Sequence, residues 1–152
     1  NASREWNLSW RASGDLFSFF VCADGIFTDH TITASTFGTP ALDGTQWCWI
    51  YAYHDQGTEI GISVNNGTIN TVGHTTGVFN GNSSLEIGRN QDGVQYIDAD
   101  IQQVAIWRKL LSSDDRTAIY NGGLGLAYSS WDASSSTSPK SLFEPRVIGV
   151  VT

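Results

Sequence analysis

Four aromatic side chains at alternating positions are the residues of this chain best suited to bind a ligand. They are Trp47, Trp49, Tyr51 and Tyr53, in a segment that ends at Asp55. Aromatic rings offer a large, rigid surface on which a sugar ring can stack, and a tyrosine hydroxyl adds a group that orients the sugar. One face of every strand in a layered β protein packs into the core, so we expect at least half of this stripe to be buried.

A recognition site built on this stripe would extend into the loops at one rim of the fold. Loops on a rigid scaffold are where binding residues concentrate. The candidate ligand-binding residues are Trp49, Tyr51, Tyr53, Asp55, Asn65 and Asn66.

Asp98 and Asp100, in the run IDADI, come nearest to a pair of catalytic carboxylates. On a strand they would share a face, and a retaining glycosidase needs its two carboxyl groups about 5–5.5 Å apart. The next position on that face is Gln102, and no Glu is available on the strand to serve as the acid. The nucleophile motifs GxSxG and HExxH are absent, and the three histidines have no partners at motif spacing. We therefore predict that the protein is not an enzyme.

Asp and Asn side chains crowd the predicted turns, where a calcium ion would find its ligands. Ca²⁺ takes six to eight oxygen ligands, and here they would have to converge from separate loops because no EF-hand spacing is present. Turn formation alone explains Asp and Asn at such positions. We expect no cofactor and keep calcium as an alternative. The metal-ligand candidates are Asp92, Asp98 and Asp100.

Charge and composition exclude several classes of partner. The net charge is −7 and the 8 Lys and Arg residues form no basic stripe, so we expect no nucleic-acid partner. No apolar run reaches the length of a membrane span.

Cys22 and Cys48 lack the CxxC spacing of a zinc site, and whether they are free thiols or a disulfide stays open.

Alternation of apolar and polar residues predicts many short strands and almost no helix. One hairpin is expected to turn at Asn66-Gly67, a pair that suits a type I′ turn. A longer strand at about 96–107 leads to a short helix, which a capping box of Ser112 and Asp115 opens and Gly122-Gly123 closes. The other strands are expected in EWNLSW, LFSFFVC, HTITAS, GTQWCWIYAYHD, EIGISVNNGTINTV and SSLEIGR. This pattern predicts an antiparallel sandwich.

Four blocks, in order, resemble those of laminin-G-like domains in the concanavalin A-like lectin/glucanase superfamily. The blocks are the Trp-led strand DGTQWCWIYAYHD, the strand and Asn-Gly turn ISVNNGT, the L-x-I-G strand SSLEIGRN, and IDADIQQVAIWRKLLSSDDRTAIYNGG, which reaches Ile-Trp before a capped helix ending in Tyr. The resemblance covers about residues 5–125. It implies an all-β, antiparallel jelly-roll β-sandwich with one short helix near the C-terminal end.

The resemblance also carries expectations about function. Glucan-hydrolysing members of the superfamily use three carboxylates at alternate strand positions, and Gln102 stands at the third position here. We therefore expect a non-catalytic module that recognises carbohydrate or a protein partner, extracellular or on a virion surface. The alternative is a structural protein of an assembly such as a virion, in a head decoration or a tail, and a glucan hydrolase is the third hypothesis.

The C-terminal residues are expected to form a separate arm. The opening strands of the family are missing, so we expect the sandwich over 1–128, a Ser-rich linker over 129–141 and an apolar strand or arm over 142–152. An exposed apolar strip of this kind is an aggregation liability unless it is paired, either with the open edge of its own sheet or with a neighbouring subunit, which we favour. The candidate docking residues are Trp131, Phe143, Val147 and Val150.

Overall fold

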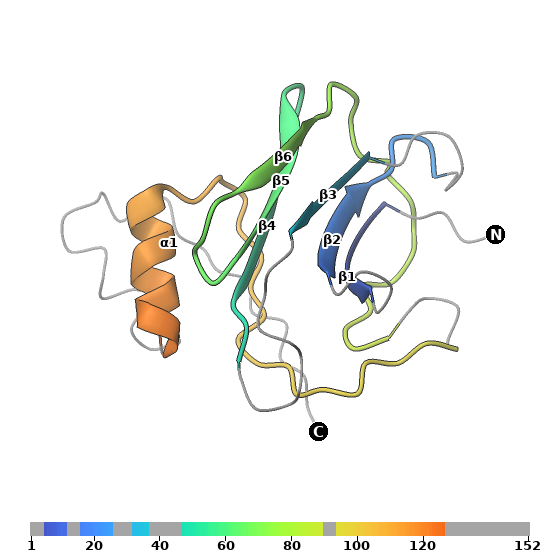
Figure 1. Cartoon of the computed structure of the whole chain (residues 1–152). Coiled ribbons are helices and arrows are strands. Elements are labelled where there is room, and N and C mark those ends of the chain that lie inside the picture. Colours follow the sequence, from blue (N-terminus) through green and yellow to red (C-terminus); the bar gives the residue numbers. More distant parts are fainter. Residues whose placement is uncertain (1–4, 12–15, 26–31, 37–46, 90–93, 127–152) are drawn as a thin grey trace. The chain divides into compact units, whose positions relative to one another are not determined.

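The computed structural model describes residues 5–11, 16–25, 32–36, 47–89 and 94–126 (Figure 1). The chain divides into two compact units, residues 1–98 and residues 99–152. Among the described residues, the first unit contains the strands and the second contains the helix.

The first unit is built from two three-stranded antiparallel sheets, drawn in blue and green in Figure 1. In each sheet the strands follow one another in sequence order, so each is a simple meander. These strands confirm the predicted strands EWNLSW and LFSFFVC, the HTITAS strand, the Trp-rich strand and the two strands on either side of the Asn-Gly turn. The strands are β1 (Trp6–Arg11), β2 (Leu16–Val21), β3 (Ile32–Thr36), β4 (Ile50–Asp55), β5 (Glu59–Val64) and β6 (Asn70–Gly73).

The two sheets pack against each other through β2, β3, β5 and β6. Their shared core is the buried cluster of Phe17, Phe19, Val21, Ile60 and Ile62. Residues at alternate positions of a strand point to the same face, so β2 and β5 each direct one side into this core. Two packed antiparallel sheets confirm the all-β class, while jelly-roll connectivity stays a prediction.

β4 adopts the predicted alternation. Cys48, Ile50 and Ala52 are partly buried and pack against the core cluster. The intervening aromatic residues therefore lie on the opposite face of the sheet. Cys22 and Cys48 are free thiols, and burial raises the pKa of the Cys48 thiol.

The turn between β5 and β6 lies one residue earlier than the sequence predicts. Asn65 and Asn66 have φ angles of 52° and 55°, and the amide of Gly67 donates to the carbonyl of Val64 at 2.9 Å. The two central residues of this type I′ turn are therefore Asn65 and Asn66, so the expected Asn66-Gly67 placement is wrong. Asparagine tolerates the left-handed region better than other non-glycine residues, which allows this placement.

The predicted strands at 83–89 and 96–107 are also wrong. These segments form no strand and carry isolated bridges alone: Arg89 pairs with Tyr96, the Ile97 amide donates to the Gly88 carbonyl at 2.9 Å, and a single bridge lies at Ile106. Gln103 has a φ angle of 54°, which turns the backbone out of the extended conformation in the middle of the expected strand. Ile101 is 45% exposed, whereas Ala105 and Trp107, on the same predicted face, are half-buried, so this face is only partly covered.

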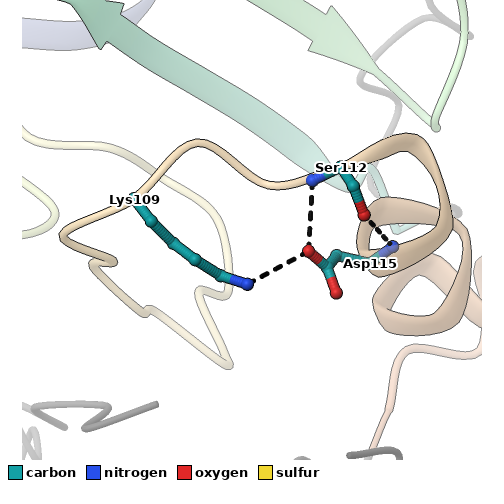
Figure 2. Close-up of polar contacts among 3 residues, drawn as sticks. All are labelled: Lys109, Ser112 and Asp115. Carbon is teal, nitrogen blue, oxygen red and sulfur yellow. Dashed lines mark hydrogen bonds and ion pairs between the residues drawn. The ribbon is translucent and has the colours of Figure 1, made fainter. Parts of the chain in front are cut away.

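The helix α1 (Ser113–Tyr120) confirms the predicted capping box (Figure 2). The Asp115 amide donates to Ser112 Oγ at 3.1 Å, and the Ser112 amide donates to Asp115 Oδ2 at 3.1 Å. Lys109 Nζ lies 3.3 Å from the same carboxylate oxygen. Burial alone would raise the pKa of Asp115, but these hydrogen bonds outweigh it and hold the pKa below its usual value.

The chain leaves α1 through consecutive residues in the left-handed region. Asn121, Gly122 and Gly123 have φ angles of 48°, 63° and 94°, and these same residues make up the short turn η1 (Asn121–Gly123). Glycine reaches these angles without a Cβ penalty, which is the reason that Gly-Gly ends a helix. The predicted C-terminal end of the helix is confirmed.

Candidate functional site

The candidate site is a row of aromatic rings on the face of β4 that points away from the core. We call Trp49, Tyr51 and Tyr53 the aromatic row. The ring centroids of Trp49 and Tyr51 are 6.1 Å apart with an interplanar angle of 10°. Those of Tyr51 and Tyr53 are 5.6 Å apart with an angle of 30°. The three rings are therefore nearly parallel.

Gly61 on β5 allows the Tyr53 ring to lie across the sheet. The two residues are direct cross-strand partners, and a Cβ added to Gly61 would lie 2.4 Å from the Tyr53 ring. Tyr53 therefore covers the glycine, and its hydroxyl donates to Oε1 of Glu59. Burial, followed by the hydrogen bond and the negative charge of Glu59, raises the pKa of Tyr53 well above its usual value.

The members of the aromatic row differ in exposure. Tyr51 is only 6% exposed, whereas Trp49 and Tyr53 are half-buried. Trp47, which precedes the row, is 55% exposed. Tyr51 therefore packs between its neighbours, and the two end rings offer the accessible surface.

Asn65 holds Trp49 in position from the neighbouring turn. The Trp49 amide donates to Asn65 Oδ1 at 2.9 Å, and the Asn65 amide donates to the Trp49 carbonyl at 2.8 Å. Because its side-chain oxygen is occupied in this way, Asn65 acts mainly as a positioning residue. Asn66 follows it in the turn and is half-buried.

The other end of the row is acidic. Asp55 is half-buried at the end of β4, and its cross-strand partner is Glu59. The structure therefore adds Glu59 and Gly61 to the candidate site, and neither was predicted. Their signal was the register of β4 on β5: a turn at 56–58 aligns Tyr53 with Gly61, and the Thr58 amide does donate to the Asp55 carbonyl at 3.0 Å.

The metal candidates are not brought together. Asp98 and Asp100 are exposed on a segment without regular structure, and Asp92 lies outside the described residues. Within the described ranges, no group of three His, Cys, Asp or Glu side chains is placed to hold a metal ion.

The helix that the structure describes is too short and polar to cross a membrane. The docking candidates Trp131, Phe143, Val147 and Val150 also lie outside the described residues.

We expect Gly61→Ala to destabilise the protein through the ring that covers this glycine. The new methyl group would displace Tyr53, and overpacking of this kind costs about 1–3 kcal/mol. The same substitution in a Tyr53→Ser background should cost much less, because the obstructing ring is gone. Urea unfolding of the four proteins measures the coupling, and a Gly61→Ala variant as stable as the parent would contradict this packing.

Comparison with known protein families places the chain in a class. Residues 1–115 match the laminin-G family model (Laminin_G_3) described as the concanavalin A-like lectin/glucanases superfamily, so the chain belongs to this family. The predicted resemblance is confirmed. Domains of this kind are generally non-catalytic, are often extracellular, and bind carbohydrate or protein. The search of curated proteins and the search of solved structures found no match.

Proposed function

We propose that this protein is a non-catalytic recognition module that binds a neutral carbohydrate on a cell or particle surface through the aromatic row. The observation that carries the proposal is the nearly parallel set of rings, of which Trp49 and Tyr53 remain accessible. Sugar rings stack on such surfaces through their apolar C–H faces, and flanking polar groups bind the hydroxyls.

The residues of the site divide this task. Trp49 and Tyr53 supply the stacking surface, and Tyr51 keeps the two rings apart and parallel. Asp55 supplies carboxylate oxygens that accept hydrogen bonds from sugar hydroxyls. The adjacent Glu59 and the net charge of −7 repel acidic glycans, which is why we expect a neutral ligand.

The same site lacks the parts of a hydrolase. Glycoside hydrolysis needs two carboxyl groups that flank the bond, one of them protonated at working pH. The two carboxylates beside the row, Asp55 and Glu59, are direct cross-strand partners at one end of it, so they do not flank a sugar that stacks on the rings. We therefore propose binding without cleavage.

The proposal is tested by calorimetric titration with a panel of neutral oligosaccharides. Trp49→Ala and Tyr53→Ala should each raise Kd about tenfold, the equivalent of one stacking contact of about 1.4 kcal/mol. Tyr96→Ala is the matched control, since Tyr96 is 68% exposed and outside the row, and its Kd should equal that of the parent. The oligosaccharide should be recovered uncut. Equal binding by all variants, or release of reducing sugar, would overturn the proposal.

A second candidate function is a structural role in an assembly such as a virion. The observation that favours it is the exposed apolar side of β1, where Trp6, Leu8 and Trp10 are 41%, 39% and 39% exposed. Docking of the C-terminal arm onto a neighbouring subunit belongs to this alternative and stays a prediction. Loss of self-association on deletion of residues 140–152 would support it.

A further inference from the structure

Within the part of the chain that the structure describes, β1 is an edge strand without lysine, proline or a bulge. Among the described strands it pairs with β2 alone, and Figure 1 shows it at the outer side of the first sheet. An edge strand presents unpaired N–H and C=O groups, which natural proteins blunt with lysine, proline or a bulge. The six residues of β1 contain no lysine and no proline, and they pair with β2 in unbroken register.

The apolar side chains of β1 extend the core side of the sheet toward solvent. Trp6, Leu8 and Trp10 oppose Val21, Phe19 and Phe17 of β2 and therefore share a face with these buried residues. The Trp6 and Phe19 rings lie 6.4 Å apart. Each of the three β1 residues nevertheless keeps about two fifths of its surface exposed. These three side chains continue the hydrophobic core at the edge of the sheet, and another strand alongside β1 would cover them.

Two copies of residues 5–11 would match each other if they paired as antiparallel strands. Residues 5–11 read E-W-N-L-S-W-R. If two copies are aligned antiparallel about Leu8, Glu5 of one opposes Arg11 of the other and Trp6 opposes Trp10. A parallel alignment would instead oppose Glu5 with Glu5 and Arg11 with Arg11. Opposite charges directly across a ladder are stabilising and like charges are destabilising, so charge selects the antiparallel alignment.

We propose that a second copy of this chain is the partner of β1. The two β1 strands pair antiparallel around a two-fold axis that passes through Leu8, perpendicular to the sheet. The arrangement is isologous, because the same surface serves both subunits. It joins the two three-stranded sheets into one and keeps both core faces on the same side, so the two apolar strips become continuous. This partner is independent of the ligand of the aromatic row, which lies on the other sheet.

Charge exchange tests the partner and the register together. Analytical ultracentrifugation of the full chain should show a monomer–dimer equilibrium, and Glu5→Lys or Arg11→Glu should each raise the dimer Kd at least about tenfold. An equimolar mixture of the two variants should recover the dimer, because every charge then faces its opposite. Glu5 Oε1 also accepts a hydrogen bond from the Gly81 amide at 2.9 Å, so the melting temperature of this variant is measured alongside. Recovery in the mixture excludes misfolding as the cause of the loss.

A cysteine on the proposed axis supplies a second readout that does not depend on charge. Opposed Cα atoms in an antiparallel pair lie about 4.5–5.5 Å apart, within the range of a disulfide. In a Cys48→Ser background, Leu8→Cys should form a covalent dimer on mild oxidation. Val94→Cys, at a residue that is 76% exposed and outside β1, should remain monomeric. A wild-type protein that stays monomeric at all concentrations, or failure of both the mixture and the crosslink, would overturn the proposal.

Discussion

Ile62→Asp is expected to abolish the cooperative folding of the first unit. Ile62 is 0% exposed and packs with Phe17, Phe19 and Val21 from the opposite sheet. The substitution removes buried apolar surface and places an unpaired carboxylate in the core, a combination that costs more than about 4 kcal/mol. Because a domain of this size has a total stability of about 5–15 kcal/mol, little or no folded protein should remain.

Two variants make the Ile62 result specific to the core face. Thr71→Asp introduces the same charge on β6, where the residue is exposed and pairs with Gly61 on the outer face. It should change stability by no more than about 0.5 kcal/mol. Ile62→Val removes one methyl group and should cost about 0.5–1.5 kcal/mol. Thermal melts followed by circular dichroism measure all three. A melt of Ile62→Asp close to that of the parent would show that β5 buries its other face.

Acid is expected to destabilise the protein through the half-buried His54, which packs against the buried His74. His54 on β4 and His74 after β6 meet edge-on, with ring centroids 4.9 Å apart, and His74 is 1% exposed. His54 Nε2 and both ring nitrogens of His74 are buried without hydrogen-bond partners. Burial, followed by the neighbouring His74, lowers the pKa of His54 below 6.5, against the opposing effects of the Asp55 charge and a backbone hydrogen bond at Thr76.

Because the pKa of His54 is lowered in the folded protein, the free energy of unfolding should fall as the pH falls. Between pH 6.5 and the folded pKa, the unfolded chain binds a proton that folded His54 does not. The contribution is fully present above pH 6.5 and is lost as pH falls through the folded value. The loss should be on the order of 1 kcal/mol for each unit by which the pKa is lowered.

Urea unfolding at several pH values between 7.5 and 4.5 measures the acid effect. The double variant His54→Phe/His74→Phe keeps two packed rings and removes the His54 imidazole, so its stability should depend less on pH in this range. Asp98→Asn, which removes an exposed carboxylate, should follow the parent. If the double variant loses stability with falling pH as steeply as the parent, the histidine pair is not the source.

The elements that sequence alone predicted well are those with local causes. The strands β1 and β2, the alternation of β4 and the capping box of Ser112 and Asp115 each follow from side chains within a few residues of one another. Alternation decides which residues share a face, and a capping box needs only the first turn of its helix. For the same reason the aromatic row was predictable as a set of side chains on one face.

Tertiary structure decided which of these side chains are accessible. Trp49, Tyr51 and Tyr53 have the same spacing and similar chemistry, yet Tyr51 is buried while its neighbours are partly open. The exposure of each ring depends on which other residues pack above it, and the alternation of residues along one strand does not specify them. Likewise, the role of Asn65 depends on a hydrogen bond to Trp49, 16 residues away in sequence.

The segment 96–107 shows most clearly where local pattern stops being sufficient. It alternates as regularly as β4, but β4 pairs along its length with β5, whereas this segment has a left-handed residue at Gln103 and pairs only through isolated bridges at Tyr96 and Ile106. A strand is stable only when a neighbour satisfies its backbone hydrogen bonds, and that neighbour is distant in sequence. The amino-acid sequence therefore determined the local turns, the caps and the sharing of faces. The packing of the two sheets and the burial of individual rings came only from contacts between distant segments.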